Sequence, residues 1–362
     1  MAVAKRVRIA DVAMQAGVGV GTVSRVLNGS PQVREATRKR VLDAIDRTRY
    51  RPSRLAAGLS RGAPASVAIV VPFLTRPSVV ARLAGVIEVL DAEGYDTIVC
   101  HVETPAQRDR QVRMLAEGHR AAGAVVISLR LSPAHLADLA AAGVRVVLID
   151  VPARGVPHTV VDDVRGGMMA TAHLIGLGHR RIGFIGDAGG GLGFSSTSDR
   201  LRGYRRALTE AGLPAEPGLA RRGRHESAAA AKMALRLFRL PEPPTAIFAA
   251  SDTQAMGVLS AADAAGLPVP RSLSVIGFDD IEMAAQLGLS TVRQPLRDSG
   301  ARGAARLAML LRGMAVSPLR EVLPLEVVAR RTTAAPKDTR TGVTGSHRPG
   351  RKAPAPLARV TS

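Results

Sequence analysis

The chain has 362 residues, enough for two or three domains with separate hydrophobic cores. Aromatic residues make up only 2% and Trp is absent, which disfavours the aromatic platforms that bind single-stranded nucleic acids. The formal net charge is +20, and a single Cys excludes an internal disulfide, as suits a reducing compartment.

Three glycines at alternate positions near the N-terminus raise the question of a nucleotide loop. Gly17, Gly19 and Gly21 match part of a G-x-G-x-x-G pattern, but Ser24 stands where the last glycine belongs. That loop follows a strand, whereas the preceding IADVAMQA has apolar residues at three- and four-residue spacings, which predicts a helix over 9–16. The glycines therefore indicate a turn between helices.

Two further helices are predicted after these glycines. In GTVSRVLN, Val23, Val26 and Leu27 share one helical face, and Arg25 and Asn28 point away from it. The third helix, REATRKRVLDAIDRTRY, is expected to bury an apolar stripe and two small contact residues, namely Val41, Leu42, Ile45, Ala36 and Ala44. This is the helix-turn-helix arrangement, whose second helix enters the major groove of DNA.

Positive charge is concentrated at the two ends of the chain. Residues 1–62 hold thirteen Lys and Arg against four Asp and Glu, and residues 335–362 hold six against one. A basic head releases counterions when it binds DNA, so salt should weaken its affinity steeply. The tail is rich in Pro, Gly, Ser and Thr and is predicted to be disordered.

From residue 65 onward, short β-branched runs alternate with helical stretches. SVAIVV, YDTIVC, AGAVVIS and VRVVLID predict four strands, and RRIGFIG, PTAIFAA and SVIGF predict a second set. The helical segments between them, such as VARLAGVIEVLDAEG, end at a glycine where a C-cap is expected. The alternation predicts two α/β units in tandem, each with a parallel sheet.

Polar residues directly follow four of these strands, namely Ser128, Asp150, Asp252 and Asp279. Ligands of open parallel sheets bind beyond the carboxyl ends of the strands, and two such units facing each other would form a cleft. Each residue alone is equally well interpreted as a helix N-cap or a loop carboxylate. Four of them aimed at one cleft favour a ligand site.

The sequence offers no support for export, membrane insertion or catalysis. The N-terminus lacks the apolar core of a secretory signal and no run of 18 apolar residues occurs, so a soluble cytoplasmic protein is expected. GDAGGGLGF lacks the Lys-Ser or Lys-Thr pair of a phosphate loop, and His173 and His179 lack partners at metal-ligand spacing. We therefore expect no enzyme, no cofactor and no bound metal.

Motifs in register from about residue 7 to 333 carry a family likeness: IADVAMQAGVGVGTVSRVLNGS, RPSRLAAGLSRG, VVDDVRGGMMATAHLIGLGHRRIGFIGD, DRLRGYRRALTEAGL, PTAIFAASDTQAMGVLSAADAAGLPVPRSLSVIGFDDIEMA and STVRQPLRDSGARGAARL. They resemble the lactose repressor and galactose repressor (LacI/GalR) family of transcriptional regulators. The resemblance implies an N-terminal all-α helix-turn-helix head, a hinge helix and a two-subdomain α/β effector domain, like periplasmic binding proteins, with parallel sheets.

The resemblance also implies domain boundaries. The head takes residues 1–51, the hinge helix 52–63, the effector domain 64–334 and the basic tail 335–362. Within the effector domain, the N-subdomain takes about 65–162 and 294–322, and the C-subdomain takes about 163–293 and 323–334.

For DNA, the resemblance points to the second helix and the hinge. Val20, Gly21 and Arg25 take the positions that face bases, and Arg25 has the planar fork that donates twice to O6 and N7 of guanine. Positions implied to contact phosphates are Thr22, Ser24 and Asn28. In the hinge, Leu59 matches a side chain that wedges into the minor groove, and Ala56 lies one turn earlier, although a flexible linker is the alternative.

Two departures from the family pattern concern helix starts. Gly19 stands where members commonly have Ser, and Arg34 stands where they have a capping residue. Glycine is a tolerated N-cap, but arginine adds positive charge at the positive end of a helix. Either the head is less stable than usual, or Arg34 contacts a DNA phosphate.

For the effector, the resemblance places Arg200 and Asp279 on the ligand. It lines the rest of the cleft with Asp150, Ser251, Asp252 and Gln294, to which the strand ends add Ser128. For Phe73, Phe194 and Phe248, cover for an apolar sugar face and core packing both stay open. Charged and amide groups around a small cavity can satisfy several hydroxyls, which favours a sugar or related polyol.

The combined prediction is a DNA-binding transcriptional regulator, a repressor of a carbohydrate-utilisation operon, working at the nucleoid. It binds a palindromic double-stranded operator as a homodimer and responds to a sugar-sized effector between the effector subdomains. A nucleobase or sugar-phosphate corepressor is the alternative, and a sugar-binding transport protein is a further one that the missing export signal disfavours. The choice of dimer or tetramer, and of induction or corepression, stays open.

Overall fold

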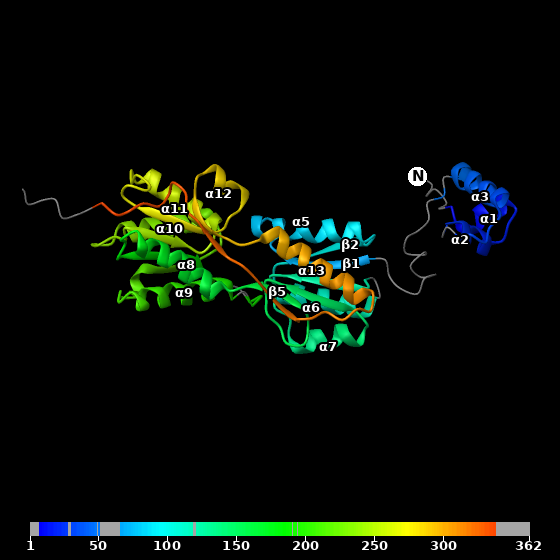
Figure 1. Cartoon of the computed structure of the whole chain (residues 1–362), viewed down its shortest axis with the longest axis horizontal. Coiled ribbons are helices and arrows are strands. Elements are labelled where there is room, and N and C mark those ends of the chain that lie inside the picture. Colours follow the sequence, from blue (N-terminus) through cyan, green and yellow to red (C-terminus); the bar gives the residue numbers. More distant parts are fainter. Residues whose placement is uncertain are drawn as a thin grey trace, which may run out of the picture. The chain divides into compact units, whose positions relative to one another are not determined.

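The structure is a computed structural model that describes residues 7–27, 30–48, 50, 66–118, 121–189, 191–193 and 195–337 (Figure 1). The predicted hinge helix with Ala56 and Leu59 lies outside these residues, as do Asn28, Phe194 and the tail from residue 338. The described elements form a three-helix head and two α/β units with one sheet each. The predicted fold class is confirmed.

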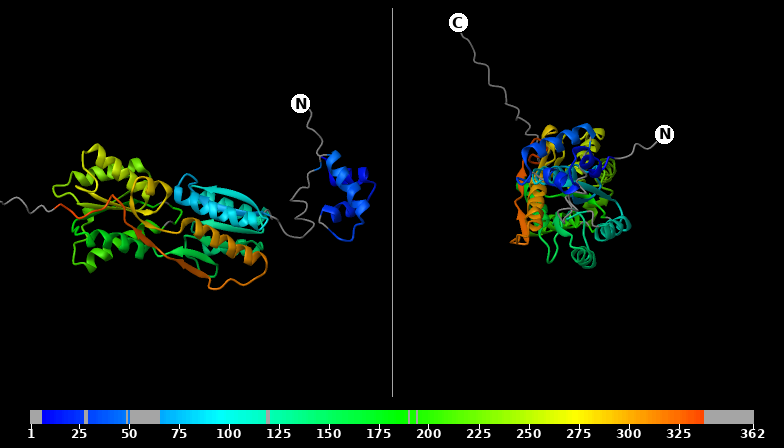
Figure 2. Two further views of the ribbon diagram at one scale, coloured as in Figure 1. Left: turned by 45° about the horizontal axis from the view of Figure 1, so that its top comes forward. Right: turned by 90° about the vertical axis from the view of Figure 1, so that its right-hand side faces the viewer.

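The head, blue in Figure 2, consists of three helices. They are α1 (Ile9–Ala16), α2 (Val20–Leu27) and α3 (Glu35–Thr48). Val12, Val23 and Val41, one from each helix, are fully shielded from solvent and form the centre of the small core. Gly17 ends α1 with φ 62°, a left-handed conformation that glycine adopts without steric cost. The first of the alternate glycines is therefore a helix C-cap.

The third helix differs from the sequence expectation at two positions. Leu42 is 47% exposed, and Ala36 is exposed as well. The buried stripe of α3 is formed by Val41 and Ala44, with Ile45 packed against it. Leu42 follows Val41 directly and is therefore rotated by about 100° around the helix, away from the stripe.

The first α/β unit contains a six-stranded sheet in the order β11-β5-β4-β3-β1-β2, parallel from β5 to β2. The strands are β1 (Ser66–Pro72), β2 (Asp96–Val102), β3 (Gly123–Ile127), β4 (Arg145–Ile149), β5 (His158–Val161) and β11 (Arg320–Leu323). The helices are α5 (Pro77–Ala92), α6 (Pro105–Gly118), α7 (Pro133–Ala141) and α13 (Leu296–Leu311). The chain leaves this unit after Val160 and returns to it for the short segment at 191–193 and for Pro295–Leu323.

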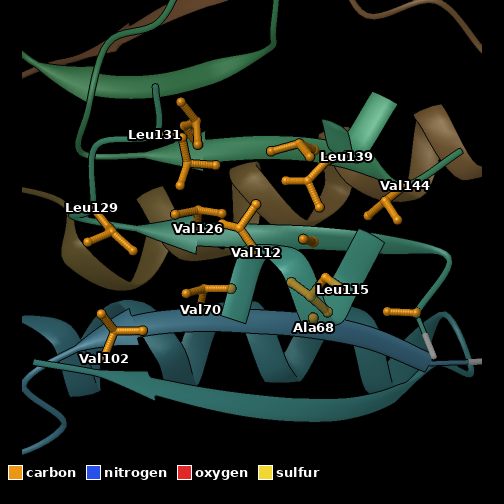
Figure 3. Close-up of a cluster of buried hydrophobic side chains, with 14 of the residues drawn as sticks. Ala68, Val70, Val102, Val112, Leu115, Val126, Leu129, Leu131, Leu139 and Val144 are labelled. Atoms are coloured by element: carbon orange, nitrogen blue, oxygen red, sulfur yellow. The ribbon is translucent and has the colours of Figure 1, made fainter. Parts of the chain in front are cut away.

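Two apolar cores cover the two faces of this sheet. Successive side chains of a strand point to opposite faces, so neighbouring residues of β1 enter different cores. Val67 and Ile69 pack with residues of α5 and α13. Ala68 and Val70 pack with residues of α6 and α7, as Figure 3 shows. Burial on both faces fixes the strand ends from which the site residues project.

The second α/β unit contains a sheet in the order β12-β10-β9-β8-β6-β7, parallel except for β12, which runs antiparallel to β10. The strands are β6 (Ile182–Asp187), β7 (Ala220–Gly223), β8 (Ala246–Ala249), β9 (Ser274–Asp279), β10 (Ser290–Arg293) and β12 (Glu326–Val328). The helices are α8 (Asp163–Gly176), α9 (Ser196–Glu210), α10 (Ser227–Phe238), α11 (Asp252–Ala264), α12 (Glu282–Gln286) and the 3-10 turn η1 (Pro217–Leu219).

Aromatic residues are few, and most of those in the second unit lie in its core. Phe184 packs against Phe248 edge to face, with 5.4 Å between the ring centres, and also against Tyr204. Phe248 is fully buried, so the core-packing interpretation holds for it. In the part of the chain that the structure describes, no helix has the length and apolarity needed to cross a membrane.

Candidate functional site

The exposed face of α2 carries the residues predicted to contact DNA. Val20 is 45% exposed, and Gly21 and Arg25 are exposed too. Thr22 and Ser24 are half-buried at the sides of the helix. The opposite face of α2 is held by the buried Val23 and Val26. The head therefore presents a short helix edge with a guanidinium and an apolar side chain.

The two unusual helix starts are both at the surface of the head. Gly19 precedes α2, and its carbonyl accepts hydrogen bonds from the backbone of Thr22 and Val23. Arg34 precedes α3 and is exposed, next to Glu35 in the first turn. The negative Glu35 partly offsets the positive charge that Arg34 brings to this helix end.

In the first unit, Phe73, Ser128 and Asp150 directly follow the neighbouring strands β1, β3 and β4. All three have left-handed backbones, with φ of 43°, 48° and 69°. Such backbones are rare for residues with a Cβ and persist where the surroundings hold them. The Ser128 hydroxyl donates to Oδ2 of Asp150 at 2.6 Å, so these two predicted residues lie together. The Phe73 ring lies 4.1 Å from the guanidinium carbon of Arg76.

Arg82 completes this strand-end group and was not predicted. Its Nη2 donates to Oδ1 of Asp150 at 2.8 Å, and the Arg82 side chain is only 4% exposed. A signal was present in the sequence, because Arg82 falls on the same helical stripe as the buried Val79 and Val86. A charged residue within a buried stripe indicates a buried ion pair, but its partner is distant in sequence.

In the second unit, Arg200 of α9 joins groups from the ends of two strands, β8 and β9, and from the start of α8. Its Nε donates to Asp163 at 2.8 Å, its Nη1 donates to the carbonyl of Ala250 at 2.6 Å, and Nη1 lies 3.8 Å from Asp279. The guanidinium carbon lies 3.6 Å from the centre of the Phe278 ring, a cation–π contact. Asp163, also missed by the sequence analysis, directly follows the Asp162 that caps α8.

Gln294 and Asp279 also meet in the second unit. The Gln294 side-chain nitrogen donates to Oδ1 of Asp279 at 2.5 Å, and both residues are buried. Asp279 ends β9 with φ 119°. Arg200, Asp279 and Gln294 thus form one cluster, and their predicted contact with an effector stays a prediction.

Ser251 and Asp252 hold the framework of this unit. The Ser251 hydroxyl accepts from the backbone of Gln254 and caps α11. Asp252 is fully buried and accepts from the Thr291 hydroxyl at 2.6 Å and from the backbone of Ile281 at 2.9 Å. Burial, with the nearby Asp279 charge, raises the pKa of Asp252 to about 8. Their predicted contact with an effector stays a prediction, whereas these observed bonds are all within the protein.

Close glycine crossings fix the helices that carry the two arginines. On α9, a Cβ at Gly203 would overlap the carbonyl oxygen of Val164 and lie 2.8 Å from the backbone nitrogen of Met168 in α8. On α5, a Cβ at Gly85 would overlap the carbonyl oxygen of Arg297 in α13. The backbones therefore touch, which places each arginine relative to its sheet with little freedom. Among the residues described, no three His, Cys, Asp or Glu side chains group as metal ligands.

A basic helix-turn-helix head joined to two parallel-sheet units with polar strand ends defines a class: DNA-binding regulators with a ligand-binding α/β region. Comparison with known families agrees. Residues 8–53 match the family described as bacterial regulatory proteins, lacI family, and residues 171–333 match the periplasmic binding protein-like domain.

Curated relatives are similar over nearly their whole length. The HTH-type transcriptional regulator DegA of Bacillus subtilis (strain 168) is 32% identical over 90% of this chain and 98% of its own. The HTH-type transcriptional regulator CelR of Thermobifida fusca is 34% identical over the same shares. The chain belongs to the LacI family of bacterial transcriptional regulators, and it is a regulator rather than an enzyme.

Solved structures show the same architecture. The lac repressor dimer bound to operator and the anti-inducer ONPF is 28% identical, with a TM-score of 0.80, and the match covers 91% of this chain and all of that one. A complex of the transcriptional regulator CelR with cellobiose is 31% identical, with a TM-score of 0.67, over 90% of this chain and all of that one.

Proposed function

We propose that this protein represses carbohydrate-utilisation genes and that a neutral sugar-sized effector controls its binding to a palindromic operator. The observation that carries the proposal is the set of polar groups at the carboxyl ends of both sheets, Asp150 with Ser128 in one unit and Arg200 with Asp279 in the other. Strand ends of parallel sheets are where such folds take ligands. The exposed Arg25 supplies the reader of the operator.

The sugar assignment is supported by the chemistry of these groups. Carboxylates accept hydrogen bonds, guanidinium and amide groups donate them, and a sugar hydroxyl needs both kinds of partner. Among the similar proteins, the CelR structure is a complex with cellobiose. Whether the ligand releases or strengthens DNA binding follows from which conformation it prefers.

We also infer that two copies act together. The first unit exposes apolar side chains on α5 and on the α5 side of the sheet-edge strand β2, two elements that contact each other: Val80, Ile87 and Val99. An exposed apolar patch beside an unpaired strand edge is a typical surface for a protein partner. Two-fold related heads would enter successive major grooves roughly 34–36 Å apart.

Selection from a random duplex library by the full-length protein tests this proposal. The expected product is a sequence with two inverted half-sites, recovered from excess competitor DNA. A thermal-shift screen with neutral sugars, nucleobases and sugar phosphates is expected to find its largest stabilisation with a neutral sugar. Recovery of no preferred duplex would contradict the regulatory role, and stabilisation by nucleobases alone would contradict the sugar assignment.

A further inference from the structure

Each α/β unit contains one arginine, Arg82 or Arg200, that is held in the same way. In each, a helix carries Arg-x-x-Gly, RLAG in α5 and RLRG in α9, at a close helix crossing. A Cβ at Gly300 of α13 would overlap the carbonyl oxygen of Arg82, and a Cβ at Gly167 of α8 would overlap that of Arg200. Each arginine backbone is therefore pressed against a neighbouring helix, and each guanidinium reaches a carboxylate at a strand end.

Arg82 is the counterpart of Arg200, but it acts through Asp150. Its side chain is 4% exposed and that of Asp150 is 12% exposed, so the carboxylate is the more accessible partner. Arg82 holds Oδ1 at 2.8 Å and Ser128 holds Oδ2 at 2.6 Å. A carboxylate offers about four acceptor positions. Among the residues that the structure describes, the side chains of Arg82 and Ser128 use two of them, which leaves two for donors from a ligand.

We propose that Arg82 is a positioning residue that makes the Asp150–Ser128 group selective for neutral polyhydroxy ligands over ligands that carry phosphate or carboxylate. Arg82 fixes Asp150 as an acceptor for ligand hydroxyls and balances its charge. The inference rests on the proposed function, in which Asp150 and Ser128 serve the effector.

Charge balance is the physical reason for this selectivity. An anionic ligand would meet the Asp150 carboxylate, which repels it. To pair with Arg82 instead, the ligand would have to break a buried ion pair and leave Asp150 without its partner, which is costly in a desolvated site. A neutral ligand leaves the Arg82–Asp150 pair intact and donates its hydroxyls to Asp150. The sugar-phosphate alternative is thereby disfavoured.

Equilibrium dialysis with matched probes tests the inference. The full-length protein is dialysed against a mixture of neutral mono- and disaccharides, including ribose and cellobiose, each paired with its phosphate ester, and the retained compounds are quantified by mass spectrometry. The wild type is expected to retain a neutral sugar at least about 10-fold more than its phosphate ester, the size of effect that one hydrogen bond to a charged group produces.

Two variants should change the retention of the two ligand types in different ways, with a gain for the esters in the first and a loss of the neutral sugar alone in the second, which a merely structural role would not do. Asp150→Asn keeps a residue that tolerates the left-handed backbone and removes the negative charge of Asp150 beside Arg82, so retention should shift about 10-fold or more toward phosphate esters. Arg82→Gln should weaken retention of the neutral sugar without any gain for the esters, and Arg82→Lys should restore most of the preference. Glu88→Gln is the control, because Glu88 pairs with Arg297 between the same two helices but at the surface.

Three results would overturn the inference. They are preferential retention of phosphate esters by the wild type, equal losses of both ligand types in Asp150→Asn, and retention of no compound by a wild type that still selects a specific duplex. The last result would leave the DNA-binding part of the proposed function standing. Failure to select any duplex would count against the proposed function instead.

Discussion

Arg200 lies with its guanidinium carbon 3.6 Å from the centre of the Phe278 ring while its nitrogens donate to Asp163 and to the carbonyl of Ala250. The planar guanidinium makes the ring contact and both hydrogen bonds at once. A lysine ammonium is a point charge and cannot, so Arg and Lys are not interchangeable at this position.

Arg200→Lys should therefore lower the affinity for the effector, the compound that stabilises the wild type in the screen, by about 10-fold or more. It should also lower the free energy of unfolding by about 1–2 kcal/mol. Calorimetric titration and urea unfolding measure the two effects. Arg206→Lys is the control, since Arg206 is an exposed residue of the same helix that pairs with Glu210. Unchanged effector affinity in Arg200→Lys would remove Arg200 from the site.

Asp252 should make stability depend on pH. Its pKa is raised to about 8 by burial, and an unfolded Asp titrates near pH 4, so the folded state holds a proton that the unfolded chain lacks between these values. The contribution of Asp252 to the free energy of unfolding is thus complete below about pH 4. It is lost as the pH rises toward 8, by at most about 1.4 kcal/mol per pH unit.

Asp252→Asn should flatten this slope while the fold survives, because an amide can accept from Ile281 and donate to Thr291. Urea unfolding of both proteins between pH 5.5 and 8 gives the comparison. Burial also lowers the pKa of His173 and His179, so their stabilising contribution is lost as the pH falls. Both proteins contain these histidines, so their effect cancels when the free energies of unfolding of the two proteins are subtracted. Equal slopes in the two proteins would disprove the raised pKa.

Gly203→Ala should destabilise the second unit by about 1–3 kcal/mol or more, because the new methyl group overlaps the backbone of α8. Gly176→Ala, in the last turn of α8, has no atom within 4 Å of the new Cβ and should stabilise by about 0.5–1 kcal/mol. Urea unfolding of the two variants distinguishes a packing effect from helix propensity. Similar values for both would show that the helix crossing is not close.

Arg25→Ala should lose about 1–3 kcal/mol of discrimination between the selected duplex and a mutated one, while non-specific binding stays salt-sensitive. Arg47→Ala removes the same charge from an exposed position on α3 and should leave discrimination unchanged. Fluorescence anisotropy with both duplexes at two salt concentrations provides the test. Full discrimination by Arg25→Ala would assign the reading of bases to other residues.

Val80→Asp combined with Ile87→Asp should convert a dimer into a monomer, because two charges would be buried in the apolar surface of α5. Met114→Asp, on α6 against the other face of the sheet, should leave the dimer intact although Met114 is 44% exposed. Sedimentation velocity measures the outcome. A monomeric wild type, or a dimeric double variant, would place the interface elsewhere.

The local patterns of the chain predicted most of its regular structure. The periodicity of IADVAMQA and the β-branched runs correspond to α1 and to strands such as β1 and β9. The short strands β5, β7 and β10–β12 went unrecognised, because segments of three or four residues carry too few positions for a period to show. Leu42 was misplaced for a related reason, since hydrophobicity alone does not give its angle around the helix.

The site was predictable only where a residue follows a strand or matches a family motif. Ser128, Asp150 and Asp279 were singled out by their position after a strand, Asp150 and Asp279 also by resemblance, and Arg200 by resemblance alone. Arg82 was missed because an arginine in a helical stretch normally lies in solvent, and its partner Asp150 stands 68 residues later. The tertiary arrangement that brings the Arg82 side chain of α5 to Asp150, just after β4, is not contained in any local pattern.

Reciprocal coupling between effector and operator tests the central claim most directly. The affinity of the full-length protein for its selected duplex is measured with and without the stabilising sugar, and the affinity for the sugar with and without the duplex. We predict that each ligand changes the affinity of the other by the same factor, roughly 5- to 150-fold. An operator affinity that saturating sugar leaves unchanged would contradict the account.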